Sequence, residues 1–257
     1  MEAVYRIDGN RAETRSHAAG PWDPRMQHGS PPSALVTWAA EQIPTAQPMH
    51  IARVTVDLMR PVPLATLTIE SEVLREGRKI QLCAVRLKAD GVEVVRATVL
   101  KVRAQDAALP PEIANSPLDV PRPEAGHLED VSGMTNPFIQ GMSISSVRGR
   151  LMVHGPGAIW YRADRPIVEG AAISQAMRAM IASDFSNATS SMLDFRKWTF
   201  LNADLTVSFA RPPVGDWILL NGETTIGPEG AGLATAQLAD ERGYFGRSIQ
   251  TLVIEKR

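Results

Sequence analysis

Two stretches, TVDLMRPVP at residues 55–63 and TVSFARPPV at residues 206–214, share one pattern. In each, apolar residues alternate as in a half-buried β-strand. The alternation stops at an Arg-Pro pair, where proline removes a main-chain donor and ends a central strand. The two stretches are 151 positions apart, and so are Arg96 and Arg247 further along the chain. This shared spacing indicates that the chain contains a duplication.

The segments around the two stretches repeat as well. A helix-like segment precedes each stretch, strand-like residues precede each helix, and strand-like segments with glycine turns follow. The plan of strands, a helix and then four strands predicts an α+β fold, with one helix of each repeat buried on a long antiparallel sheet. We expect repeats at 1–103 and 147–257, joined by a proline-rich linker at 104–146. The two sheets should join edge to edge, because a lone repeat leaves an unpaired edge.

Bulk composition excludes several classes of protein. The 257 residues hold 27 basic and 28 acidic side chains, so the basic excess of a nucleic-acid binder is missing. No apolar run approaches the roughly 20 residues that span a bilayer. The start, MEAVYRIDGN, lacks the features of a secretory signal, so we expect a cytoplasmic protein. The five histidines show no metal-ligand spacing, and we expect no metal.

The second helix-like segment carries a carboxylate where an apolar residue is expected. Its apolar stripe follows the helical offsets 0, 3, 4, 7 and 8 and consists of Ile173, Ala176, Met177, Met180 and Ile181. The next offset falls on Asp184. Burial disfavours a charged carboxylate, and the negative end of the helix dipole repels it. Asp184 therefore either ends the helix and faces water or is a functional group. Alignment of the repeats sets Glu41 opposite Asp184, and we expect Glu41 to be an exposed residue closing the first helix, with a working carboxylate as the alternative.

The order and spacing of several segments resemble the double-hotdog acyl-CoA thioesterases of the type II, thioesterase-like superfamily. These segments are MQHGSPPSAL, RPVP, VLREGRKIQ, WYRADRP, ASDF, LNADLTVSFARPP and GRSIQTLV. The resemblance covers nearly the whole chain except the linker. It implies a double-hotdog fold and cleavage of acyl-CoA thioesters without a metal or organic cofactor. It also implies further packing of repeats through sheet faces, so we expect a homodimer.

The resemblance also implies roles for particular residues. In this family an aspartate at the end of the second helix acts with a threonine and a glutamine to hold and activate water. The matching positions here are Asp184, Asn202 and Gln250, and Asn202 departs from the family's threonine. An asparagine still offers a carbonyl acceptor and two N–H donors. The alternatives are a solvated strand face for Asn202 and a strand-edge position for Gln250, with Thr206 as a reserve candidate.

The oxyanion of the reaction needs hydrogen-bond donors, and the first helix start is one source. Ser30 is a good N-cap and Pro31 a good first helical residue. Free N–H groups at a helix start favour an anion. Since two successive prolines lack that group, Gly29 and Ser30 are the oxyanion candidates, beside the Gln250 amide. Arg78 and Lys79 are weaker candidates for binding CoA phosphates, with a solvated turn as the alternative.

Two other functions compete with thioester hydrolysis. An enoyl-CoA hydratase of this fold needs a histidine near the aspartate, usually in a D-x-N-P-x-H context. The stretch DFSNATS has Asp184 and Asn187 but no histidine, which argues against hydration. The other alternative is a non-catalytic protein that binds acyl-CoA or lipid, because fold does not establish function.

Overall fold

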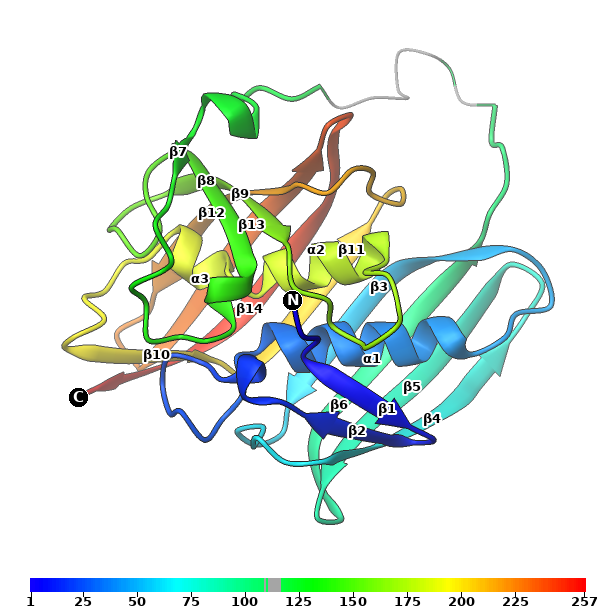
Figure 1. Cartoon of the computed structure of the whole chain (residues 1–257). Helices are drawn as coiled ribbons and strands as arrows, with labels where there is room; N and C mark the ends of the chain where they lie inside the picture. The colour runs from blue at the N-terminus through cyan, green and yellow to red at the C-terminus, as the bar shows by residue number, and fades with distance from the viewer. Residues whose placement is uncertain (109, 111–116) are drawn as a thin grey trace.

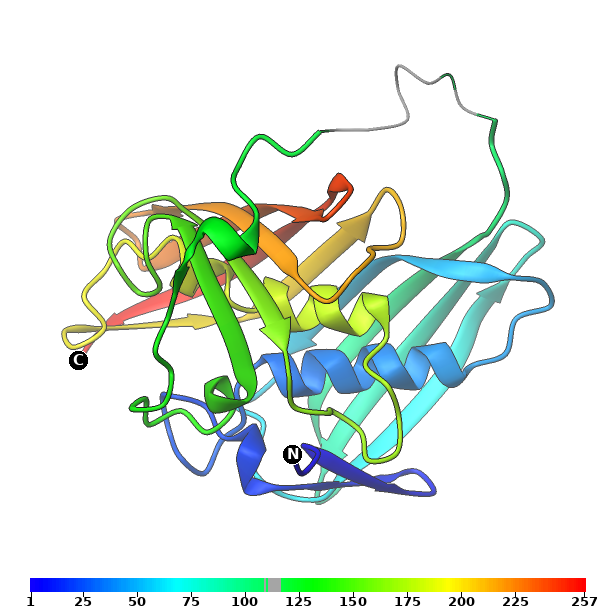
Figure 2. The same cartoon turned by 45° about the horizontal axis from the view of Figure 1, so that its top comes forward.

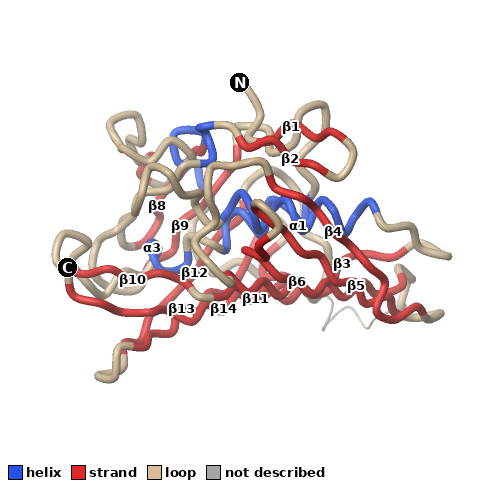
Figure 3. Tube along the Cα trace, turned by 90° about the horizontal axis from the view of Figure 1, so that it is seen from below, coloured by secondary structure: helices blue, strands red, loops and turns tan. Residues whose placement is uncertain are grey.

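The computed structural model describes residues 1–108, 110 and 117–257. One sheet of 14 strands curves around two main helices (Figure 1). Helix α1, Ser30–Gln42, and helix α2, Gln175–Ser183, pack against each other. Figure 3 shows both helices lying between the central strands of the sheet and its two curled ends. The predicted α+β class and double-hotdog arrangement are confirmed.

The two repeats have the same strand order in the sheet. The first runs β1-β2-β4-β5-β6-β3, and its strands are β1 (Tyr5–Asp8), β2 (Arg11–Thr14), β3 (Met49–Leu58), β4 (Leu67–Glu76), β5 (Ile80–Ala89) and β6 (Val92–Arg103). The second runs β8-β9-β12-β13-β14-β11, and its strands are β8 (Met142–Arg148), β9 (Gly157–Ala163), β11 (Asp204–Phe209), β12 (Ile218–Ile226), β13 (Ala231–Asp240) and β14 (Gly243–Lys256). Shorter elements are β7 (His127–Leu128) beside β8, β10 (Trp198–Asn202) beside β14, helix α3 (Ser186–Thr189), and 3-10 turns at Ser16–Ala18, Pro123–Ala125 and Ile139–Gly141.

The repeats meet edge to edge, as predicted. Strand β3 pairs with β11 in antiparallel register, with Thr55 opposite Thr206. These two threonines are also 151 positions apart, the offset of the duplication. Thr206 Oγ1 donates a hydrogen bond to Thr55 Oγ1 at 3.2 Å. Because the repeat offset and the strand register coincide at this pair, a local pseudo-twofold axis passes between the two residues.

Helix α1 is buried along nearly its whole length. Small residues such as Ala34 and Ala40 are fully buried and let the neighbouring elements approach closely. The helix begins at Ser30 and its N-cap is Gly29, so the expectation that Ser30 caps the helix is wrong by one residue. The reason lies in the Ser30 hydroxyl, which is turned towards α2 and lies 3.0 Å from the carbonyl oxygen of Ile181.

Helix α2 begins later than its apolar stripe suggests. Ser174 is its N-cap, and the Ser174 hydroxyl accepts a hydrogen bond from the Met177 N–H at 3.1 Å. Ile173 therefore precedes the helix, while Met177 and Met180 are buried on its inner face. Asp184 is the C-cap, where the helix ends. Within the described residues, no helix is long and apolar enough to cross a membrane.

Within the predicted linker, residues 117–146 lie along the second repeat (Figure 2). Trp160 Nε1 donates a hydrogen bond to the carbonyl oxygen of Pro121 at 2.9 Å. Leu118 and Val120 pack against a small apolar cluster that includes Trp160. This segment therefore fastens to the second repeat by apolar and hydrogen-bond contacts. The boundary at 146/147 stays a prediction, and β8 runs across it.

Candidate active site

Asp184 lies buried at the junction of the two helices. Its side chain is 3% exposed. Because α1 and α2 are antiparallel, the C-cap of α2 lies beside the start of α1, and Ser30 Oγ is 3.1 Å from Asp184 Oδ2. The positive end of the α1 dipole and its hydroxyl thus offset the repulsion that the α2 C-terminus exerts on the carboxylate. Of the two alternatives, the one in which Asp184 faces water is therefore wrong.

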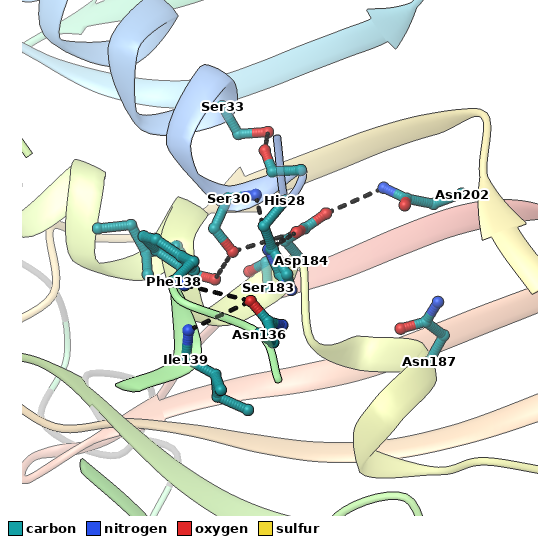
Figure 4. A network of polar contacts seen from close by, with 12 residues as sticks. His28, Ser30, Ser33, Asn136, Phe138, Ile139, Ser183, Asp184, Asn187 and Asn202 are labelled. Atoms are coloured by element: carbon teal, nitrogen blue, oxygen red, sulfur yellow. Dashed lines mark hydrogen bonds and ion pairs between the residues drawn. The ribbon is translucent and has the colours of Figure 1, made fainter. Parts of the chain in front are cut away.

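Side-chain donors from separate segments converge on this carboxylate, and Figure 4 shows those of His28, Ser30 and Asn202. Asn202, at the end of β10, donates from Nδ2 to Asp184 Oδ1 at 2.9 Å. Gln250, from β14, lies with Nε2 3.5 Å from the same oxygen and donates to the Asp184 main-chain carbonyl at 3.2 Å. His28, just before α1, has Nδ1 2.9 Å from Asp184 Oδ2. Such a set of donors holds a carboxylate in one orientation.

Gln250 carries an unused acceptor inside the site. The residue is fully buried, and among the described residues its Oε1 atom has no hydrogen-bond partner. Buried polar atoms are nearly always paired with protein or water. The Gln250 carbonyl beside Asp184 is therefore suited to accept a hydrogen bond from a water molecule or a substrate.

Gly29 lies against the carboxylate because it has no side chain. A Cβ atom built on Gly29 would be 2.4 Å from Asp184 Oδ1 and 2.8 Å from Oδ2. The backbone angle φ of Gly29 is −67°, an ordinary helical value, so space and not conformation requires a glycine here.

His28 is the residue at this site that the sequence analysis missed. Its ring packs against those of both Phe138 and Phe185, with centroid distances of 5.2 and 4.7 Å. His28 Nδ1 is also 3.2 Å from the Ser30 main-chain nitrogen. One ring nitrogen cannot donate to Asp184 and accept from Ser30 at once. When Nδ1 carries its hydrogen and donates to Asp184, the Ser30 N–H is free for another acceptor. In the sequence, the one feature that could have pointed to His28 is its position directly before the N-cap of the first helix.

The structure therefore brings together five of the predicted site residues, namely Asp184, Asn202, Gln250, Gly29 and Ser30. Arg78 and Lys79 lie elsewhere, at the exposed turn between β4 and β5. Thr206, the reserve candidate, lies at the seam between the repeats. The argument that the aspartate lacks a histidine neighbour is wrong, because the fold supplies His28 from the first repeat.

Glu41 also differs from its expected place on the surface. It lies half-buried at the end of α1, where its Oε1 accepts a hydrogen bond from Ser174 Oγ at 2.7 Å. Burial raises the pKa of Glu41, and the charge of Lys101 acts in the opposite direction. The carboxylates of the two repeats thus occupy corresponding positions at opposite ends of the helix pair.

Two profiles of known domain families match the sequence. The acyl-CoA thioesterase N-terminal domain matches residues 18–102, and the acyl-CoA thioesterase C-terminal domain matches residues 114–254. The chain belongs to the acyl-CoA thioesterase family. This places its substrate chemistry in the class of acyl thioesters. No curated protein sequence matches this thioesterase-family chain significantly.

Solved structures of similar fold cover almost the whole chain. A hot dog fold protein of unknown function from Alicyclobacillus acidocaldarius is 17% identical, has a TM-score of 0.76, and is aligned over 98% of this chain and 95% of its own. A tesB protein from Mycobacterium avium subs paratuberculosis is 16% identical, with a TM-score of 0.71 and coverage of 97% and 94%. An acyl-CoA thioesterase II from Mycobacterium marinum is 11% identical, with a TM-score of 0.67 and coverage of 98% and 95%. At these identities the likeness shows the shared fold.

Proposed function

We propose that the protein hydrolyses acyl-CoA thioesters, with Asp184 as the general base. The observation that carries this proposal is the buried carboxylate oriented by Asn202, His28 and Ser30. Beside it, Gln250 Oε1 has no hydrogen-bond partner in the described part of the chain. A positioned base contributes about 10²–10⁴-fold to a rate. Asn202 and Gln250 would hold the attacking water against Asp184.

The reaction follows from these positions in two steps. Asp184 takes a proton from water while the water oxygen bonds to the thioester carbonyl carbon, which produces a tetrahedral oxyanion. The C–S bond then breaks, the carboxylic acid forms, and the CoA thiolate takes the proton back from Asp184. The Ser30 N–H, free when His28 Nδ1–H donates to Asp184, is the candidate donor to the oxyanion. Loss of one such donor typically costs about 10²–10³-fold in kcat.

A hydrolysis screen tests the proposal. The protein is incubated with saturated acyl-CoA esters of increasing chain length, and a thiol-reactive dye records release of CoA. We expect release that depends on Asp184. A protein that binds acyl-CoA without turning it over, the non-catalytic alternative, would release no thiol above the uncatalysed rate with any ester. That result would contradict hydrolysis.

The His28–Asp184 contact favours a second candidate, hydration of an enoyl-CoA. Addition of water across the double bond requires a group that takes a proton from water and a group that gives one to carbon. The two side chains lie 2.9 Å apart and offer such a pair. Ultraviolet absorbance of the conjugated enoyl thioester separates the reactions. Hydration removes the absorbance without releasing thiol, whereas hydrolysis releases one thiol for each thioester consumed.

A further inference from the structure

A pocket of about 290 Å³ lies at the end of the helix pair opposite to Asp184. It is formed where α1 ends, where α2 begins, and where β3 and β6 pass below them. Its polar lining includes Glu41, Lys101 and Gln175, and its apolar lining includes Ile51, Met49 and Phe209. The volume is close to the lower end of the about 300–1,000 Å³ typical of ligand pockets, so a small ligand or part of a larger one fits.

The pocket is the pseudo-symmetric counterpart of the Asp184 site. The Ser174–Glu41 hydrogen bond at its edge corresponds to the Ser30–Asp184 contact. The strand pairs correspond too, because Ile51 is opposite Lys101 in the first repeat as Asn202 is opposite Leu252 in the second. Asn202 follows Ile51 by 151 positions in the chain, and Leu252 follows Lys101 by the same number.

The polar groups of the two sites nevertheless differ. Ile51 stands where the second repeat has Asn202, and Val99 stands where it has Gln250. The pocket therefore lacks both amides that would hold a water at Asp184. At the position where the second repeat has Leu252, the first repeat has the ammonium group of Lys101. These replacements disfavour hydrolysis in the pocket and favour a different use.

Lys101 and Gln175 provide one donor and one acceptor that the protein uses incompletely. Lys101 is 4% exposed, and its Nζ donates to the Ile43 carbonyl at 2.8 Å. That carbonyl is its one hydrogen-bond acceptor in the described part of the chain, although an ammonium carries three N–H groups. Within the same residues, the buried Oε1 atom of Gln175 has no partner. Unpaired polar groups of this kind are expensive when buried, which favours a ligand that satisfies both.

We propose that this pocket binds a small ligand that carries a secondary amide between alkyl groups. The amide carbonyl accepts from Lys101, the amide N–H donates to Gln175 Oε1, and the alkyl groups contact Met49, Ile51 and Phe209. A carboxylate would satisfy Lys101 but would face Glu41 and leave Gln175 Oε1 unpaired. An alkylammonium would be repelled by Lys101. The proposal does not depend on hydrolysis at Asp184.

Binding of three matched probes tests the assignment. N-butylacetamide, hexanoate and butylammonium are titrated into the full-length protein, and saturation-transfer NMR reports the affinity of each. We expect the amide to bind most tightly. Lys101→Met and Gln175→Leu should each lower the affinity for the amide, and the loss for Lys101→Met should be about tenfold because it removes a charged donor. Lys256→Met, which removes an exposed lysine outside the pocket, should leave amide binding unchanged within about twofold.

Thermal unfolding of each variant shows whether it is folded, and Gln175→Leu alone decides the question if Lys101→Met does not fold. Asp184→Asn should retain amide binding, which separates this pocket from the Asp184 site. Equal affinity of the amide for Gln175→Leu and the wild type, or tighter binding of hexanoate than of the amide, would overturn the proposal.

Discussion

Ser30 Oγ lies 3.1 Å from Asp184 Oδ2, so the start of one helix contacts the carboxylate that ends the other. This contact explains how a carboxylate is tolerated at a buried helix C-terminus. The antiparallel neighbour presents its positive end to Asp184, and the positions of both helices are fixed by the edge-to-edge joining of the two repeats. The site thus exists only where the two repeats meet.

The space beside Gly29 predicts a sharp loss of activity on adding one methyl group. Gly29→Ala would place Cβ 2.4 Å from Asp184 Oδ1, so the carboxylate must move. Displacement of about 1 Å can cost about 10²-fold in rate. We expect kcat/KM for a good acyl-CoA substrate to fall by at least about tenfold. Gly133→Ala is the matched control, because no atom of residues 1–108, 110 and 117–257 lies within 4 Å of its added Cβ. Equal rates for the two variants would show that Gly29 does not shape the site.

His28 is predicted to position Asp184 through Nδ1. His28→Leu removes this contact, and we expect kcat to fall by about tenfold or more. His28→Asn places an amide N–H at the same number of bonds from Cβ as Nδ1, so it should recover a large part of the lost rate. Steady-state kinetics of both variants tests this prediction. An asparagine variant as slow as the leucine variant would instead assign a role to the rest of the ring.

The arginines of the two Arg-Pro motifs are predicted to contribute unequally to the stability of the protein. Arg211 makes a bidentate ion pair with Asp240, at 2.6 and 2.8 Å, and Asp240 is fully buried. Removing one partner of a buried pair costs about 3–5 kcal/mol. Arg211→Gln should therefore lower the free energy of unfolding by about that amount in urea titrations. Arg60, its exposed counterpart in the first repeat, is the control, and Arg60→Gln should change stability by less than about 0.5 kcal/mol. A similar decrease in the free energy of unfolding in both variants would contradict this prediction.

A homodimer remains a prediction, and we propose the outer face of β13 and β14 as its interface. Leu233, Ile249 and Val253 are 40, 41 and 46% exposed on these strands. Light scattering should give twice the chain mass of 27.9 kDa, and Ile249→Lys should shift the protein towards monomer. A monomer at all concentrations of the wild-type protein would reject the homodimer.

Much of the fold could be predicted because its signals are local and repeated. The 151-residue offset between the two Arg-Pro stretches revealed the duplication, and the unpaired edge of a lone repeat predicted that the two sheets join. The structure adds which strands join, since Thr55 of β3 lies opposite Thr206 of β11. Asp184 was recognisable because a charge at an apolar helical position is a local conflict, and such conflicts are typical of functional sites.

The rest of the site depends on contacts between segments far apart in the chain. His28 and Asp184 are separated by more than half of the sequence, and no periodicity connects them. Glu41 was misjudged for the same reason, since the helix that half-buries it belongs to the other repeat. The cap of α1 was displaced because Ser30 bonds across the helix pair, an interaction that local capping rules do not contain.

The most direct test of the account is the activity and the melting temperature of Asp184→Asn, measured on the same preparation. The substitution keeps the size of the side chain and removes its basic oxygen. We predict that kcat/KM for a good acyl-CoA substrate falls about 10²–10⁴-fold while the protein still unfolds cooperatively. Activity within about twofold of the wild type in the folded variant would contradict the assignment of Asp184 as the base.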